Sequence, residues 1–199
     1  MALTKHPFTA ESPLAKPAMY CNLDQLLDGC LKMRLKGASP PVALLIEGFP
    51  RPHHPIAEFV KLLFLLRAHG AKATFVVDWY DIRERGLCAS VSQMMLLLTR
   101  NGHEVAVKFK ALPCTATQLR QQAVEALHFL QRVYGISVVS AKVGCRMNGA
   151  SAALETLGIT IVNGVKEQRV VNDSADMITE VETILEALRG RAFVGVSRL

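Results

Sequence analysis

Apolar runs of strand length alternate with helical segments along most of this chain, and this alternation constrains the fold more than any other feature. The expected strands are Val42–Ile46, Ala73–Val77, Val105–Phe109, Ser137–Val143, Ile159–Val162 and Ala192–Val196. Strands that are continuously apolar, and not apolar at every second position, are typical of a parallel sheet covered on both faces. The sequence therefore predicts an α/β domain, either a barrel of β/α units or an open doubly wound sheet.

Residues suited to helix ends separate these strands. The expected helices run from Pro55 to a stop at Gly70, from Ser90 or Ser92 to Asn101-Gly102, from Thr115 or Thr117 to Gly135, over Ser151–Leu157, and from a cap at Ser174 to Leu188. An amphipathic helix over Leu23–Leu35 precedes them and either covers part of the fold or docks a partner. We divide the chain into an N-terminal extension, residues 1–39, and a β/α domain, residues 40–199.

Composition limits the environment of the protein. The chain has 199 residues, 50% of them hydrophobic and 20% charged, as in an ordinary globular domain. The apolar run Phe59–Leu66 is far shorter than the ~20 residues of a membrane span, so no transmembrane segment is expected. Five cysteines without a CxxC pair favour free thiols in a reducing intracellular compartment, either cytoplasmic or mitochondrial.

The net charge of +6 permits an anionic partner, such as nucleic acid or an acidic protein. Lysines and arginines are spread along the whole chain, however, and form no block. This pattern favours a solvated basic surface over a dedicated nucleic-acid site, although nucleic acid remains an alternative partner.

Several segments in this order are similar to motifs of one enzyme family. His69–Val77 reads HGAKATFVV, Gly102–Val105 reads GHEV, and Leu157–Asn163 reads LGITIVN. They resemble the "HGxKATFFV", "GHEIGNH" and "LGxTVVNW" runs of the polysaccharide deacetylase (NodB-homology) family, over about Pro41–Asn163. The resemblance implies an irregular (β/α) barrel with ligands at the carboxyl ends of the strands.

The same resemblance implies a divalent metal held by one Asp and two His, and a neighbouring Asp that acts as the base. This chain departs from that pattern. The family's "TFDDGP" falls on Glu47 and Gly48, and its "HxxxH" pair falls on Lys108 and Leu112. An ammonium group held near 4 Å from a divalent cation would be repelled by roughly 8 kcal/mol at an effective dielectric of 20. We therefore expect no metal and no catalytic residue, with Glu47 as a vestige of the base.

Other residues could form a replacement site. Asp78, Lys108, Lys110 and Arg146 follow neighbouring strands and form a candidate anion pocket, although Asp78 and Lys108 can equally neutralise each other. His53 and His54 are adjacent in a Pro-flanked loop, which favours solvated surface over a metal site. His103 and Glu104 begin a strand, so we interpret them as scaffold residues.

Three functional hypotheses follow. The leading one is an inactive deacetylase-like protein that works as a structural or interaction subunit of a larger assembly, for example a mitochondrial one, with other protein subunits as partners and no cofactor. The second is a hydrolase that uses Glu47 with a rearranged metal site or with none. The third is an anion- or RNA-binding module, whose affinity would fall steeply with salt.

Overall fold

The computed structural model describes residues 40–48, 55–85, 89–109, 115–144, 149–162, 168–172, 174 and 176–198, and the structural statements below concern these residues. All of them belong to the unit Ser39–Leu199. The predicted helix at Leu23–Leu35 and the extension of residues 1–39 lie outside the described residues, so both stay predictions.

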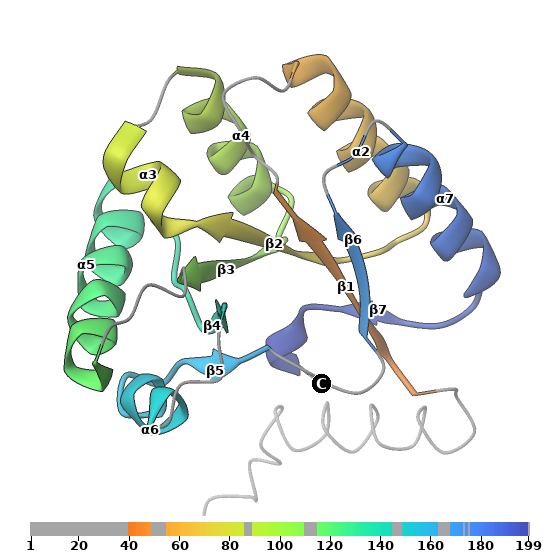
Figure 1. Ribbon diagram of the computed structural model, residues 1–199. Helices are drawn as coiled ribbons and strands as arrows, with labels where there is room; N and C mark the ends of the chain where they lie inside the picture. Colours follow the sequence, from red (N-terminus) through yellow and green to blue (C-terminus); the bar gives the residue numbers. More distant parts are fainter. Residues whose placement is uncertain are drawn as a thin grey trace, which may run out of the picture. The chain divides into compact units, whose positions relative to one another are not determined.

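The domain is a parallel β/α half-barrel, which confirms the expected fold class (Figure 1). Six parallel strands follow the order β5-β4-β3-β2-β1-β6, and a seventh, β7, pairs with the start of β1. The strands are β1 (Val42–Glu47), β2 (Ala73–Asp78), β3 (Glu104–Phe109), β4 (Ser140–Val143), β5 (Thr160–Ile161), β6 (Gln168–Asn172) and β7 (Phe193–Val194).

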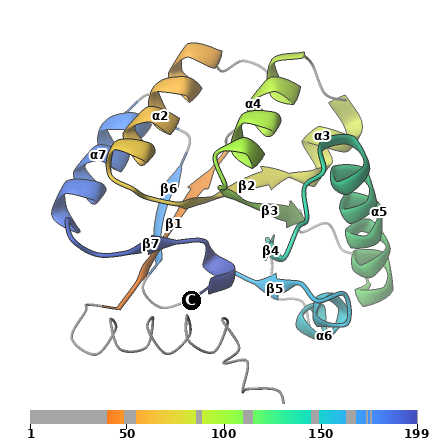
Figure 2. The same ribbon diagram turned by 180° about the vertical axis from the view of Figure 1, so that it is seen from behind.

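Helices connect the strands and cover the outer face of the sheet (Figures 1 and 2). They are α2 (Ile56–Ala68), α3 (Trp79–Arg85), α4 (Ala89–Arg100), α5 (Ala116–Tyr134), α6 (Ala150–Glu155), α7 (Met177–Ala187) and the 3-10 turn η1 (Val196–Arg198). Among the described helices, none combines the length and apolar character needed to cross a bilayer.

The two faces of the sheet explain why the strands are continuously apolar. Side chains at alternate positions, such as Leu44, Ile46 and Phe75, pack outward in one large core shared with the helices. The intervening positions turn into the half-barrel, where a smaller core consists of Ala43, Leu45, Val76, Ala106, Val162 and Val196. Each central strand is therefore buried on both faces, as parallel strands usually are.

Helix ends follow the predictions in part. Thr115, and not Thr117, caps α5, where its hydroxyl accepts a hydrogen bond from Gln118 N in a capping box, and Gly135 ends the helix with φ 67°. The prediction for Ser174 is wrong: α7 has Asp176 as its N-cap residue, and Ser174 contributes only its carbonyl, which accepts from Met177 N.

Two further corrections concern the helix starts and the chain end. Ser90 and Ser92 both lie inside α4, where the Ser92 hydroxyl is 3.2 Å from the hydroxyl of Tyr134, so neither caps the helix. The predicted strand Ala192–Val196 is shorter than expected, because Val196 already belongs to η1. Its side chain belongs to the interior core.

The C-terminal segment is fastened across the amino ends of the strands. Val196 N donates to the buried Thr74 hydroxyl over 2.9 Å, and Ser197 donates to the Glu104 carboxylate from both its amide and its hydroxyl. The other oxygen of Glu104 accepts from the Ser140 hydroxyl over 2.6 Å. This network satisfies the polar groups at one end of the half-barrel, so the opposite end is where a functional site can open.

Candidate functional site at the carboxyl ends of the strands

Four charged side chains occupy inward-facing positions at the carboxyl ends of four neighbouring strands. They are Glu47 on β1, Asp78 on β2, Lys108 on β3 and Lys142 on β4. Their chain neighbours Ile46, Val77, Val107, Ala141 and Val143 pack in the outer core, and successive side chains of a strand point to opposite faces. The register places Asp78 opposite Lys108, and Lys108 opposite Lys142. Strand alternation therefore turns all four charges into the half-barrel.

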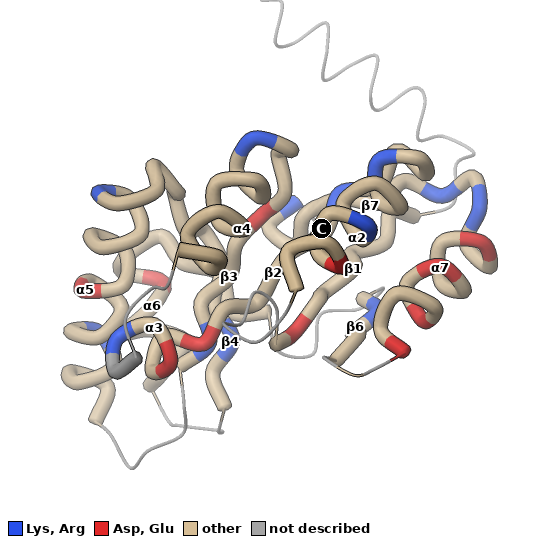
Figure 3. The backbone as a smooth tube through the Cα atoms, turned by 90° about the horizontal axis from the view of Figure 1, so that it is seen from above, with Lys and Arg blue, Asp and Glu red and all other residues tan. Residues whose placement is uncertain are grey.

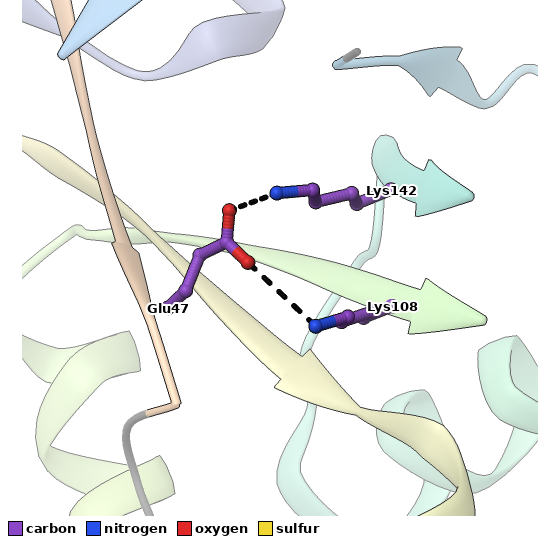
Figure 4. A network of polar contacts seen from close by, with 3 residues as sticks. All are labelled: Glu47, Lys108 and Lys142. Atoms are coloured by element: carbon purple, nitrogen blue, oxygen red, sulfur yellow. Dashed lines mark hydrogen bonds and ion pairs between the residues drawn. The ribbon is translucent and has the colours of Figure 1, made fainter. Parts of the chain in front are cut away.

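Glu47 is the centre of this cluster (Figure 4). Its Oε1 accepts a hydrogen bond from Lys142 Nζ, and its Oε2 lies 3.8 Å from Lys108 Nζ. The Glu47 side chain is only 9% exposed, whereas those of Lys108 and Lys142 are 36% and 28% exposed. A buried carboxylate is stable only when it is paired and hydrogen-bonded, and here both of its oxygens face an ammonium group.

The contact with Lys142 depends on the curvature of the sheet. In the strand order, β2 and β3 separate β1 from β4. In a flat sheet, three spacings of about 4.8 Å would place these two strands some 14 Å apart. Lys142 nevertheless reaches Glu47 directly, because the half-barrel curls and its inward side chains converge. The cluster is therefore a product of the fold and not of neighbouring positions along the chain.

Asp78 has a second role at the same edge of the sheet. Its Oδ1 accepts from Tyr80 N over 3.0 Å and from Asp81 N over 3.4 Å. An aspartate that accepts from the second and third amides of a helix acts as its N-cap, so Asp78 fixes the start of α3. Neutralisation of Asp78 by Lys108 stays a prediction, because the ion pair that the structure gives for Lys108 is with Glu47.

The remaining predicted site residues lie outside the described residues. Lys110 and Arg146, which complete the candidate anion pocket, belong to these, as do His53 and His54. The structure brings together Glu47, Asp78 and Lys108 at the carboxyl ends of the strands, as the sequence predicts for parallel strands. The anion pocket as a whole stays a prediction.

Lys142 is the site residue that the sequence analysis missed. It lies in a four-residue strand, Ser-Ala-Lys-Val, between side chains that are buried. A lysine at the inward position of a short buried strand needs an anion nearby, and this is the signal that could have identified it. The identity of that anion could not be read from the sequence, because Glu47 is 95 residues away.

Gly48 follows Glu47 with φ 84°, a left-handed conformation that favours glycine. A residue with a β-carbon would be strained here, although Asp and Asn tolerate this region better than most residues. The backbone conformation at this position, next to Glu47 as the only acid of β1, therefore suits the glycine that is present.

The residues around Glu47 do not fit a divalent metal. A cation at the carboxylate would have to displace Lys142 and approach a second ammonium group, that of Lys108. Within the described ranges, no group of three His, Cys, Asp or Glu side chains comes together. We therefore derive no chemical step through a metal at this site.

His103 and Glu104 lie at the amino end of β3, away from the cluster, as predicted. His103 Nδ1 accepts from Ala73 N over 3.3 Å, and its ring packs edge-on against Phe75. Burial, and to a lesser degree the charge of Lys72, lowers the pKa of His103 to about 4. The imidazole is therefore neutral at physiological pH and joins β2 to the start of β3, so its role is structural.

Comparisons with known proteins identify the class of fold. No protein-family model and no curated protein matches the sequence. Among solved structures, the chain is similar to a family 4 carbohydrate esterase from Bacillus anthracis, with 16% identity, a TM-score of 0.60, and 80% of this chain and 81% of the other covered. PdaA of Bacillus subtilis, also a family 4 carbohydrate esterase, gives 13% identity, a TM-score of 0.59 and coverages of 87% and 88%.

A third neighbour differs in kind. It is a mutant, with restored enzymatic activity, of a CE4 family pseudoenzyme from Bacillus anthracis. The identity is 10%, the TM-score is 0.61, and the match covers 82% of this chain and 68% of the other. At these identities the comparisons show the fold alone: the half-barrel is that of the CE4 polysaccharide deacetylases, a fold found in esterases and in pseudoenzymes.

Proposed function

We propose that this chain is a non-catalytic member of the deacetylase-like fold, and that it works as an interaction subunit of a larger protein assembly. The observation that supports this is the Glu47 carboxylate, which is held by Lys142 and Lys108 at the carboxyl ends of the strands. In the family that the sequence resembles, these strand ends carry the metal ligands and the base.

The charges of the cluster explain why the chemistry would be absent. Metal-assisted hydrolysis needs a Lewis acid that polarises a carbonyl and lowers the pKa of bound water. An ammonium group neutralises a carboxylate but has no open coordination position for water or substrate. Lys142 and Lys108 would thus supply the positive charge that Glu47 needs without the reactivity of a metal.

The interaction role rests on elimination and on the surface of the domain. The chain carries a net charge of +6, and several large apolar side chains of its described helices are exposed. Both features suit a protein that contacts other macromolecules. The five cysteines favour a reducing compartment, and a mitochondrial or a cytoplasmic assembly would meet this condition.

Two measurements on the full chain test the loss of catalysis. Titration calorimetry with Zn²⁺ and Co²⁺ should give no stoichiometric heat, and hydrolysis of 4-nitrophenyl acetate and of N-acetylated chitin oligomers should not exceed that of Glu47→Gln. Stoichiometric binding of either metal, or hydrolysis that Glu47→Gln abolishes, would reject the proposal and favour the rearranged hydrolase.

The interaction role has its own test. Gentle purification from the native source, followed by mass spectrometry, should give the chain with other subunits in fixed stoichiometry. A solitary monomer would contradict the assembly role. If the partner were RNA, nuclease treatment would release it and its affinity would fall steeply with salt, which would favour the third hypothesis.

A further inference from the structure

Helices α2 and α4 lie side by side on the outer layer of the domain (Figures 1 and 2). A groove runs between them. We call it the α2–α4 groove; its lining residues are Val60, Leu63, Phe64, Arg67, Leu97 and Asn101. The four residues from α2 recur at helical spacing along one face, whereas Leu97 belongs to α4 and Asn101 directly follows the last residue of that helix, Arg100. The groove is therefore a continuous surface between two helices.

The size of the groove suits one bulky apolar side chain. Its volume is about 130 Å³, close to the roughly 150 Å³ of an apolar cavity that binds benzene. Leu63 is buried at its base, with 6% of its surface exposed. A leucine or phenylalanine from a partner would fill this space and remove the lining residues from water.

Phe64 is the most exposed large apolar side chain of this groove. It is 65% exposed, the largest value among the exposed large hydrophobic side chains of the described residues. The core does not need it, because Phe59, Leu62, Leu63 and Leu66 form the buried face of the same helix. Aromatic residues and arginine are enriched in protein interfaces, and this groove presents Phe64 beside Arg67.

The charges around the groove define its partner. Lys61 and Arg67 are exposed on α2, and Arg100 is exposed at the end of α4. Helix α4 contains no Asp or Glu, and the acidic residue of α2 is Glu58 in its first turn. Acidic residues gather on α7 instead (Figure 3). A basic rim around an apolar groove suits an apolar anchor flanked by acidic residues.

We propose that the α2–α4 groove binds an amphipathic helix of another protein, which inserts one leucine or phenylalanine between Phe64 and Leu97 and places Glu or Asp side chains against Lys61, Arg67 and Arg100. The inference rests on the proposed interaction role and names its surface. A helix suits the site, because the groove between two packed helices receives the side-chain ridge of a third.

A second copy of this chain fits the groove less well. The acidic helix of this chain is α7, and its apolar residues Met177, Val181 and Leu185 are buried in its own core. The two isoleucines of α7, Ile178 and Ile184, are partly buried against the same core, so α7 offers no fully exposed apolar anchor to another copy. Two α2–α4 grooves brought together would oppose like charges, which is unfavourable.

The binding test uses a fluorescein-labelled amphipathic helical peptide of 18 residues, with leucines at helical spacing and glutamates beside them. A peptide with lysines in place of the glutamates serves as the probe control. Fluorescence anisotropy with the full chain should detect the acidic peptide, and Phe64→Ser and Arg67→Glu should each weaken binding at least tenfold. Val133→Ser, which also introduces a serine at an exposed apolar position, a valine that is 50% exposed on α5, should leave peptide binding unchanged.

Three outcomes would overturn the groove proposal. One is equal binding of the acidic and basic peptides, or binding that Phe64→Ser does not change. Another is a concentration-dependent dimer that Phe64→Ser abolishes, which would make a second copy the occupant. The third is sedimentation with anionic phospholipid vesicles, lost in Phe64→Ser, without peptide binding, which would make a membrane surface the occupant. Circular dichroism melting should show that the variants fold equally.

Purification from the native source separates this inference from the proposed function. A partner that is kept by Val133→Ser and lost by Phe64→Ser supports both, if it contains an acidic amphipathic helix. A partner kept by both variants leaves the interaction role intact and rejects the groove. If the wild-type chain has no partner, the interaction role itself fails.

Discussion

Glu47→Gln should destabilise the protein by about 2 kcal/mol. The substitution keeps the size of the side chain but removes the charge that Lys108 and Lys142 share. At 3.8 Å, one ion pair contributes roughly 1 kcal/mol in water and about 4 kcal/mol at an effective dielectric of 20. Removing one partner of a buried pair costs about 3–5 kcal/mol, and the partial exposure of both lysines reduces this cost to about 2 kcal/mol.

The assay is urea denaturation of the full chain, followed by circular dichroism, with the free energy of unfolding extrapolated to water. Glu182→Gln, at an exposed position of α7, is the matched control and should change stability by less than about 0.5 kcal/mol. Lys142→Met should cost more than Lys108→Met, because Lys142 makes the direct hydrogen bond with Glu47 and Lys108 only the longer ion pair.

A triple variant tests the reasoning most directly. Replacing Glu47 with Leu and both lysines with Met removes the carboxylate together with its two cations, so neither Glu47 nor a lysine is left without its partner, and the variant should recover most of the loss. If Glu47→Gln were as stable as the wild type, the cluster would contribute nothing, and the account of Lys108 and Lys142 as its required cations would be refuted.

The remaining predictions concern the scaffold. The pKa of His103 is about 4 in the folded protein and about 6.5 in the unfolded chain. Between these pH values the unfolded chain binds more protons, so the free energy of unfolding falls as pH drops, by roughly 1–2 kcal/mol after allowance for solvent screening. Urea denaturation at pH values from 7 to 4.5 should show this fall, and His103→Gln should flatten the profile. Gly195→Ala would press a β-carbon against Glu104 Oε2 and should cost about 1–3 kcal/mol in the same assay, and an unchanged stability would contradict the contact. Thr115→Ala removes the capping box of α5 and should cost about 1 kcal/mol, whereas Thr117→Ala should cost clearly less.

The sequence predicted most of the sheet, because a strand buried on both faces is recognisable from its own residues. The edge strand β6 was missed because it is not buried on both faces: Gln168–Asn172 reads QRVVN, and only Val171 is fully buried. The helix α3 was missed because it has seven residues and begins directly after β2. Elements that are short or half-exposed carry too few apolar residues to show a period.

The candidate site was predicted in its location but not in its pairing. That Glu47, Asp78 and Lys108 share one end of the fold follows from the parallel direction of the strands. That Lys142 binds Glu47 follows from the strand order and from the curling of the sheet, which bring β4 to β1 across two other strands. Neither the strand order nor the curvature can be read from the residues next to Glu47 or Lys142, so their spacing in the sequence could not predict this contact.

Under the proposed function, the cluster also explains how such a fold can persist without catalysis. A carboxylate that is 9% exposed needs a cation whether or not any reaction takes place. If that cation were a bound metal, the stability of the site would depend on the metal supply and would fall when the ligands were lost. Here the cations are side chains of the protein itself, Lys108 on β3 and Lys142 on β4, so they cannot dissociate. Their contacts with Glu47 join β1 to β3 and β4 at the carboxyl ends of the strands, opposite the end to which η1 is bound. Under the proposed function, the two lysines stand in place of the metal, which removes the Lewis acid but keeps the scaffold stable. The metal titration tests the first of these consequences, and the unfolding of Glu47→Gln tests the second.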